Sequence, residues 1–270
     1  MKKFFVPLCG LVMILSSCEV FDTFFNQSES DCQLLSTEWS IPNDPAKLTT
    51  EYIYDADDKL IELIRTDYDL DDSNSIIRFE ITYTGDKINE IIYYSKFLTQ
   101  VEQKQLRYVF YFLGDEVDSV AVTGFNDYEY TNDYILTKYE NGKLVELKTY
   151  QIDAINGDDV LTRTKVLTWT GDNVSSIGRQ FINGSMSTVN YEYDDKNSPL
   201  VSVGLAIANH KLFTILSKNN LIRASQPGGV LGGTGEIVYE ISYNDNDYPE
   251  SIQEILNYDT YPTTYTYDCK

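Results

Sequence analysis

Few side chains in this sequence have the type and spacing that catalysis needs. His210 is the sole histidine, so a Ser-His-Asp device has one possible base and a metal site with two imidazole ligands is excluded. The glycine-rich loop GGVLGGTG at 228–235 lacks the lysine and the helix start of a phosphate-binding loop. We therefore assign no catalytic residue and no metal ligand, and we expect no cofactor.

Acidic residues offer two further kinds of chemistry. Asp67, Asp69, Asp71 and Asp72 resemble the opening of a calcium loop, but the sixth position is Asp72 instead of Gly and the twelfth is Arg78 instead of Glu. The alternative is the charge of a solvated turn. Two carboxylates could also hydrolyse glycosidic bonds. With 42 Asp and Glu present, most of them in turns, the spacing singles out no pair.

The element that must position these side chains is a repeated β-hairpin. The unit is YTGDKINEI at 83–91, in which an aromatic residue precedes a short turn and an apolar residue follows it. Gly, Asn and Asp in such a turn accept the positive φ that a tight hairpin demands. Six further copies open at Tyr54, Phe112, Tyr139, Trp169, Tyr193 and Tyr243.

The apolar residue after the turn recurs every 26 to 30 residues in the first six copies, which indicates a repeat architecture. A second apolar residue follows three places later, as in Ile88 and Ile91. Residues three apart on a regular strand face opposite sides, so both can be buried on one side only if the first belongs to the turn or lies at a bulge. We therefore expect the first residue to fold back over the hairpin tip and the second to face the core. The alternative is a sheet that is buried on both faces. The first residues of these pairs are Leu60, Ile88, Val117, Leu144, Val174, Leu200 and Pro249.

Length and composition favour a single acidic β-domain. A chain of 270 residues with uninterrupted repeats fits one large unit, and 22 tyrosines suit a half-exposed sheet. The formal net charge of −21 argues against nucleic acid as a partner, because phosphate binding needs Lys and Arg. The charge also keeps an exposed sheet soluble and blunts its edges.

The N-terminus has the features of an export signal. Lys2 and Lys3 precede a short apolar run, and the residues LSSC at 15–18 resemble the lipobox of bacterial lipoproteins. That resemblance implies that residues 1–17 are removed and that Cys18 carries the lipid. We expect residues 18–46 to form a tether, although Trp39 and Ile41 are candidates for packing, and 47–270 to form the domain.

Two other features interrupt the repeats. Cys32 and Cys269 are an even pair in an exported chain, so they either form a disulfide or remain as two free thiols. The pattern breaks at 204–236, where helical spacing around 212–216 is followed by the glycine-rich loop. We expect a short helix and loop there, and we place the candidate ligand region at His210 and Phe213 of this insertion and at Trp169.

A family resemblance follows from the order of these motifs. The tyrosine-led hairpins, the NSPL turn at 197–200, the stretch ending in Asn219-Asn220 and the DYP turn at 247–249 resemble an uncharacterised family of bacterial lipoproteins described as having a porin-like fold. Tyrosine-aspartate (YD) repeat proteins are more distantly similar. The resemblance implies an all-β protein, a large antiparallel meander of tandem hairpins that is strongly curved or closed into a barrel. It brings no established activity and no functional residues.

The predicted location is the outer membrane of the cell envelope, with contact to the membrane through the lipid anchor. Charges interrupt both faces of the predicted strands, so we expect the barrel to hang from its lipid rather than to span the bilayer. The favoured function is a non-enzymatic binding or structural module, whose partner is a glycan, an apolar ligand or an envelope protein. The alternative is a carboxylate-dependent hydrolase that acts on glycans near 204–236.

Overall fold

The structure is a computed structural model that describes residues 32–41, 46–68, 74–96, 100–125, 133–153, 156–182, 184–199, 216–226, 235–256 and 259–269. Within these ranges the chain forms sixteen β-strands. They are β1 (Cys32–Ser40), β2 (Lys47–Tyr54), β3 (Leu60–Tyr68), β4 (Asn74–Thr84), β5 (Lys87–Lys96), β6 (Gln103–Leu113), β7 (Glu116–Gly124), β8 (Asp133–Glu140), β9 (Lys143–Ile152), β10 (Asp159–Thr170), β11 (Asn173–Phe181), β12 (Met186–Asn197), β13 (Asn219–Ser225), β14 (Glu236–Tyr243), β15 (Pro249–Leu256) and β16 (Asp259–Cys269).

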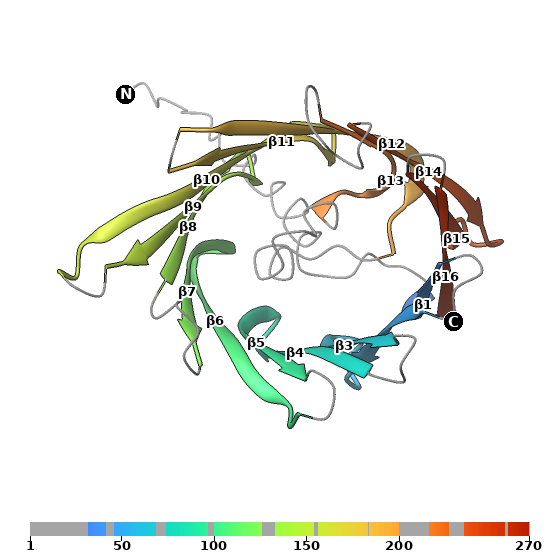
Figure 1. The fold of residues 1–270 in the computed structure, drawn as a ribbon, viewed down its shortest axis with the longest axis horizontal. Coiled ribbons are helices and arrows are strands. Elements are labelled where there is room, and N and C mark those ends of the chain that lie inside the picture. Colours follow the sequence, from blue (N-terminus) through green and yellow to red (C-terminus); the bar gives the residue numbers. More distant parts are fainter. Residues whose placement is uncertain are drawn as a thin grey trace, which may run out of the picture.

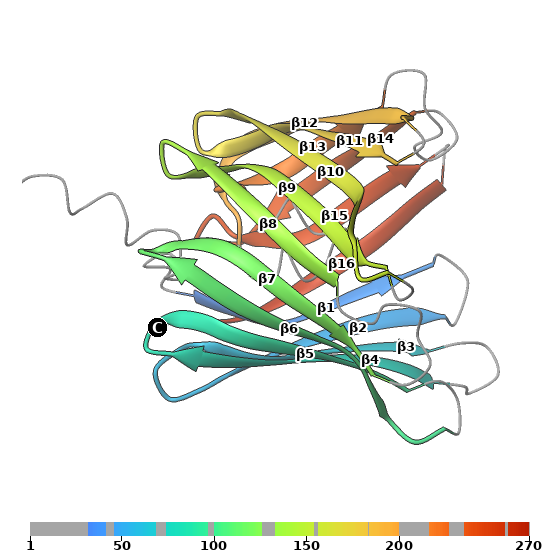
Figure 2. The same ribbon diagram turned by 90° about the vertical axis from the view of Figure 1, so that its left-hand side faces the viewer.

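The strands form one closed antiparallel barrel (Figure 1). Each strand pairs with the strand before it and the strand after it, and β1 pairs with β16 from Cys32↔Cys269 to Trp39↔Thr263 to close the wall. The strands cross the wall at a slant, as a barrel requires (Figure 2). The predicted all-β meander is therefore confirmed, and of the two alternatives, a curved sheet or a closed barrel, the closed barrel is correct.

The barrel has two unlike ends. The turn end carries the short connections that follow β2, β4, β6, β8, β10 and β14, and it also holds Cys32 and Cys269. The long connection between β12 and β13 also leaves and rejoins the wall at the turn end, and the loop end carries the remaining connections. The tight turns use the conformations that their sequences predict: Asn141 and Gly142 have φ of 53° and 73°, and Gly85 has φ of 62°.

A β-bulge follows each of these short turns and explains the paired apolar residues. Tyr83 pairs with Ile88 and Thr82 pairs with Glu90, so Asn89 is left without an opposite residue. The extra residue turns Ile88 and Ile91 to the same face, where they are 5% and 0% exposed. Of the two explanations the bulge is correct, and Ile91 faces the core as predicted. The assignment of Ile88 to the hairpin tip is wrong, because Ile88 pairs with Tyr83 in the ladder.

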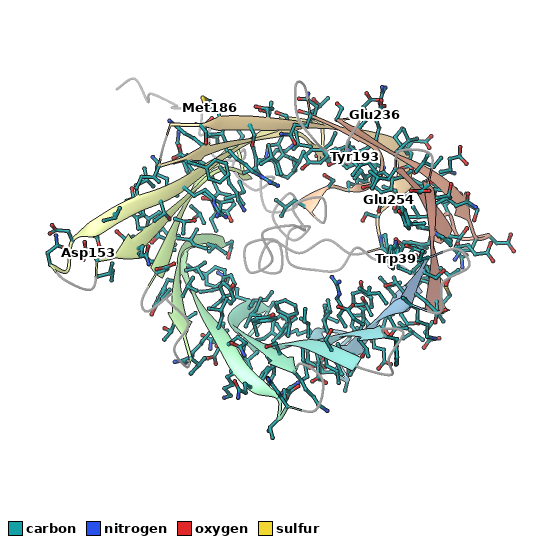
Figure 3. The ribbon with its side chains drawn as sticks, in the orientation of Figure 1. Trp39, Asp153, Met186, Tyr193, Glu236 and Glu254 are labelled. Carbon is teal, nitrogen blue, oxygen red and sulfur yellow. A yellow bond between two sulfur atoms is a disulfide. The ribbon has the colours of Figure 1, made fainter. Side chains whose placement is uncertain are left out.

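The barrel wall has distinct inner and outer faces. Tyr193 and Glu254 lie inside the ring, whereas Met186 lies outside (Figure 3). Strand register extends this assignment round the wall. Met186 pairs with Gln180 on the outer face, so the alternate residues Ile177 and Arg179 of β11 face inward.

The inner face holds the apolar core. Its buried residues run from Leu60 of β3 to Ile177 of β11, and Leu216, just before β13, joins them. The outer face carries ion pairs instead. Arg78 of β4, for example, lies 3.0 Å from Glu62 of β3 and 2.7 Å from Glu102. None of the described residues belongs to a helix long and apolar enough to cross a bilayer.

The structure differs from the sequence-based boundaries at two points. The expected tether at 18–46 contains β1, which starts at Cys32 and is one of the strands of the barrel wall. The sixth hairpin was expected to return after Leu200, but its return strand is β13, which lies within the expected insertion and pairs with β12 through Tyr193↔Leu221. Leu200 and residues 212–215 of the helix expected around 212–216 lie outside the described residues.

Candidate functional site

Of the residues predicted to bind or carry a ligand, Trp169 is the one whose surroundings the structure describes. Cys18, His210 and Phe213 lie outside the described residues. Trp169 donates its indole N–H to the carbonyl of Leu144 at 2.8 Å, and the Lys143 ammonium lies 5.4 Å from its ring centroid. The ring also packs against the core. These contacts indicate that Trp169 joins neighbouring hairpins.

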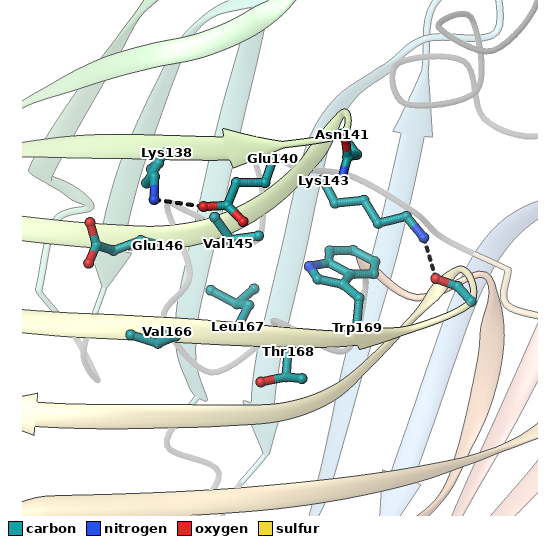
Figure 4. A pocket seen from close by; sticks show the side chains of 11 residues that line it. Lys138, Glu140, Asn141, Lys143, Val145, Glu146, Val166, Leu167, Thr168 and Trp169 are labelled. Carbon is teal, nitrogen blue, oxygen red and sulfur yellow. Dashed lines mark hydrogen bonds and ion pairs between the residues drawn. The ribbon is translucent and has the colours of Figure 1, made fainter.

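Trp169 lines an open depression of about 570 Å³ near the turn end of β8, β9 and β10 (Figure 4). The charged side chains in this depression pair with nearby side chains. Lys138 lies 2.7 Å from Glu140, Lys143 lies 3.4 Å from Asp172, and Glu146 lies 2.9 Å from Lys148. A ligand would have to compete with these pairs, so the depression offers few unsatisfied groups for recognition.

A smaller pocket of about 310 Å³ lies inside the barrel, and we regard it as the candidate site. Its described wall consists of residues on six strands, β1, β2, β13, β14, β15 and β16, and of two residues that follow β12. Strand register brings them together: Tyr239 pairs with Glu254, and Thr37 pairs with Tyr265. The residues that line it are Leu34, Thr37, Tyr52, Ser198, Pro199, Asn219, Asn220, Leu221, Tyr239, Pro249, Ile252, Glu254, Thr263 and Tyr265.

Burial sets the protonation of the groups in this inner pocket. It raises the pKa of Tyr52 to about 12 and raises the pKa values of Tyr239 and Tyr265, so all three phenols keep their protons at neutral pH. Burial also raises the pKa of the Glu254 carboxyl above its ordinary value. Among the described residues that line the pocket, Glu254 is the one carboxylate. The site therefore combines phenol donors, two amides and a partly desolvated acid.

A hydrogen-bond network at the turn end holds the floor of the pocket. Asn173 and Asn219 bond to each other twice: the Asn173 amide donates to the Asn219 side chain at 2.8 Å, and the Asn219 backbone N–H donates to the Asn173 side chain at 3.0 Å. Asp194 accepts the backbone N–H of Asn220 at 3.1 Å and the hydroxyl of Tyr243. This network fixes Asn219 and Asn220 where the β12–β13 connection returns to the wall.

The tyrosines of the pocket were not singled out from the sequence. Their signal is visible in the alternation Tyr261-x-Thr263-x-Tyr265-x-Tyr267, which places four side chains on one face of β16. The sequence does not show which residues from distant parts of the chain lie next to these tyrosines. Tyr52 and Tyr265 are more than 200 residues apart and become neighbours in one pocket through closure of the barrel between β1 and β16.

The calcium hypothesis gains no support from the described residues. Asp67 lies 3.2 Å from Arg65, and its other carboxylate oxygen accepts the Ser75 hydroxyl at 3.4 Å. Asp69, Asp71 and Asp72 lie outside the described residues. Within the described part of the chain, no group of three or more His, Cys, Asp or Glu residues is arranged to hold a metal ion.

Comparison with known proteins assigns the fold. No family model and no curated protein matches the sequence. A porin-like protein from Bacteroides uniformis superposes with a TM-score of 0.56 at 9% identity, over 87% of this chain and 98% of that chain. A porin-like protein from Bacteroides vulgatus has 13% identity over the same shares with a TM-score of 0.34. The first of these likenesses shows that the chain shares the barrel fold of porin-like proteins.

Proposed function

We propose that this protein is a lipid-anchored, non-enzymatic binding module of the bacterial cell envelope that holds a small neutral carbohydrate in the pocket inside its barrel. The observation that carries the proposal is the chemistry of that pocket. Tyr52, Tyr239 and Tyr265 supply aromatic surface, and Glu254, Asn219 and Asn220 supply hydrogen-bonding groups around about 310 Å³ of space.

A carbohydrate suits this lining better than a purely apolar ligand does. An apolar ligand would remove water from the Glu254 carboxylate without giving it a hydrogen bond, which is costly. The hydroxyl groups of a sugar can donate to that carboxylate and to the amide oxygens, while the apolar faces of its ring lie on tyrosine rings. The volume limits the ligand to about one or two sugar units.

Titration calorimetry with a panel of mono- and disaccharides tests this proposal. Tyr265→Ala should weaken binding at least tenfold, because it removes an aromatic wall of the pocket. Glu254→Gln should weaken a neutral sugar by less, because the amide still accepts hydrogen bonds. The control is Tyr111→Ala, since Tyr111 is 54% exposed and faces outward. A panel without any binder, or equal losses in Tyr265→Ala and Tyr111→Ala, would refute the assignment.

Export and anchoring are supported by the leader, by the lipobox-like LSSC and by the disulfide between Cys32 and Cys269, which an oxidising compartment favours. The charged outer face supports a barrel that hangs from its lipid, because a transmembrane barrel needs an apolar outer band. Metabolic labelling with palmitate tests the anchor. Cys18→Ala should abolish the label and release the protein from membranes, whereas Cys32→Ser should keep the label.

The hydrolase alternative is not favoured by this pocket. Inverting and retaining glycosidases use two carboxyl groups on opposite sides of the scissile bond. The described part of the pocket lining contains one, Glu254. The single acidic residue of 204–236 is Glu236, which faces outward and pairs with Arg223. Incubation of the protein with any sugar that it binds, followed by chromatography, should recover that sugar uncleaved.

A further inference from the structure

Two aromatic rings are stacked on the inner face of the barrel where β1 meets β16. The ring centroids of Trp39 and Tyr261 lie 5.6 Å apart, with an interplanar angle of 16°. Trp39 pairs in register with Thr263, which lines the inner pocket, and Tyr261 is the alternate residue on the same strand (Figure 3). Both rings therefore share the inward face. Because β1 ends at Ser40 and β16 begins at Asp259, the stack lies toward the loop end of the barrel.

The stack continues the wall of the inner pocket toward the loop end. Tyr265, Thr263 and Tyr261 are successive alternate residues of β16, and the first two line the pocket. Alternate residues of a strand lie about 7 Å apart, so these three side chains cover about 13 Å of the inner face. Glu254 joins the two regions, because it lines the pocket and pairs in register with Tyr261. The pocket and the stack are thus one continuous strip of the inner wall.

Solvent reaches the inner face beside the stack. Leu48 pairs with Trp39 on one side and with Asp67 on the other, so Asp67 belongs to the same inner row. Asp67 and Arg65 form an ion pair at 3.2 Å, and their side chains are 38% and 45% exposed although they face inward. Trp39 and Tyr261 are also partly exposed. A ligand that enters from the loop end therefore has access to the two rings.

The surroundings of Trp39 differ from those of the other tryptophan. Trp169 packs against the core and donates its indole N–H to the Leu144 carbonyl. Neither Trp39 nor Tyr261 belongs to the apolar core that the described residues form. Partly exposed Trp and Tyr rings offer a large, rigid surface that loses little conformational entropy when a ligand packs on it. The stack therefore suits ligand contact better than Trp169 does.

We propose that Trp39 and Tyr261 form a second sugar-binding subsite, so that the ligand of the barrel is an oligosaccharide of about three or more units that enters through the loop end. This inference rests on the proposed carbohydrate binding in the inner pocket. The terminal one or two units occupy the pocket, and the next unit lies against the stacked rings. Glu254 accepts hydrogen bonds from hydroxyl groups at the junction. The net charge of −21 favours a neutral chain over an acidic one.

Titration calorimetry of the full chain with oligosaccharides of increasing length tests the second subsite. The probes are the maltose, cellobiose and xylobiose series, each from one to six sugar units. In the series that binds, affinity should rise at least about tenfold from the disaccharide to the tetrasaccharide and then level off. Trp39→Ala should remove this rise and leave the affinity for the disaccharide within about twofold of the wild type.

The matched control is a stacked aromatic pair on the outer face. The ring centroids of Tyr134 and Tyr150 lie 5.0 Å apart with an interplanar angle of 7°, and Tyr150 lies three residues along β9 from the inward-facing Leu147. Tyr150→Ala should therefore keep both the affinity for the disaccharide and the rise with chain length. An equal loss of that rise in Tyr150→Ala and Trp39→Ala would contradict a specific role of the inner stack.

Tryptophan fluorescence gives a second readout, in which Trp39 stays intact, and it also serves if Trp39→Ala fails to fold. The chain has two tryptophans, so Trp169→Phe leaves Trp39 as the single indole. A sugar unit that packs on this ring displaces water from it. The emission should therefore move to shorter wavelength with the trisaccharide and tetrasaccharide, and much less with the disaccharide, which the pocket holds.

The outcomes separate failure of the second subsite from failure of the pocket. Disaccharide binding that Tyr265→Ala weakens, without a rise along the series and without a shift of the Trp39 emission, keeps the pocket and overturns the second subsite. Longer chains that shift the Trp39 emission but bind equally well to Tyr265→Ala support the subsite and refute the pocket. Absence of binding by every probe at millimolar concentration refutes both.

Discussion

At the scale of single residues, Lys165 makes the stability of the barrel depend on pH. Its pKa in the folded protein, about 7, lies below the ordinary value of 10.5. Between these values the unfolded chain binds a proton that the folded chain does not, so stability rises with pH across this window, by up to about 1.4 kcal/mol per pH unit. The rise should end near pH 10, where buried tyrosines such as Tyr52 begin to favour unfolding because their folded pKa values are raised.

Urea denaturation at pH 7, 8 and 9 measures this effect. The wild-type midpoint should increase over this range, and Lys165→Met should flatten the increase, because the variant has no side chain to titrate. The outward-facing Lys148→Met serves as the control and should keep the wild-type slope. An identical slope in Lys165→Met would show that another group carries the pH dependence.

Trp169 illustrates how a residue suited to ligand binding can instead hold hairpins together. Trp169→Phe keeps most of the aromatic surface but leaves the Leu144 carbonyl without its indole donor. We expect a loss of about 1 kcal/mol in the free energy of unfolding. Tyr111→Phe, at an exposed site, should cost nothing measurable. Saccharide affinity should be unchanged in Trp169→Phe, and a large loss of that affinity would restore Trp169 as a ligand-binding residue.

At the scale of elements, the bulged hairpin is the unit that the sequence describes best. Its turn residues, its aromatic start and the two apolar residues after the turn are all local signals. Lysines that follow the turns then reach the next hairpin along the barrel. Lys59 lies 2.8 Å from the Gly85 carbonyl and 2.8 Å from Asp86, and Lys87 lies 2.8 Å from Asp115. These contacts explain why the same lysine position recurs in the copies at 59, 87 and 143.

The bulge predicts unequal effects for two neighbouring positions of β5. Ile91 is 0% exposed, so Ile91→Ala should lower the free energy of unfolding by about 2–5 kcal/mol through lost burial and a cavity. Asn89, the extra residue of the bulge, is exposed, so Asn89→Ala should change the free energy of unfolding by less than about 0.5 kcal/mol. Urea denaturation of the two variants measures both changes. Comparable losses at both positions would contradict the inward orientation that the bulge gives to Ile91.

What the sequence could not predict depends on contacts between distant segments. β1 lies in the range that the sequence predicts as a tether, because residues 18–46 lack the hairpin repeat. Its position in the barrel is set by pairing with β16. β13 was assigned to an insertion because its partner β12 lies across a long connection. The pocket residues Tyr52, Tyr239 and Glu254 were missed for the same reason, since each is an ordinary strand residue until closure brings the strands together.

At the scale of the whole molecule, the two faces of the wall carry opposite chemistry. Apolar side chains of β3 to β11 fill the inner face, and Arg78, Arg223 and their acidic partners lie on the outer face. Transmembrane barrels have the reverse arrangement, with an apolar outer band and a polar interior. The charged outer face therefore supports the proposed barrel that hangs from its lipid rather than spanning the bilayer.

Closure also leaves one seam that differs from every other pair of neighbouring strands. All other neighbours are consecutive in the chain, whereas β1 and β16 meet with a chain separation of 237 residues between Cys32 and Cys269, which a disulfide joins at the turn end. In the chain-entropy view, a cross-link that closes so long a loop stabilises the folded state by up to about 5 kcal/mol. Reduction should therefore loosen this seam first.

Hydrogen exchange followed by mass spectrometry, with and without a reducing agent, tests this expectation. Reduction should speed exchange in β1 and β16 much more than in β8 and β9, and should lower the urea midpoint by the equivalent of about 2–5 kcal/mol. The double variant Cys32→Ser, Cys269→Ser should show the reduced behaviour in either condition. Uniform acceleration in all strands would mean that the barrel opens as one unit, and no acceleration would mean that the ladder from Cys32↔Cys269 to Trp39↔Thr263 closes the wall unaided.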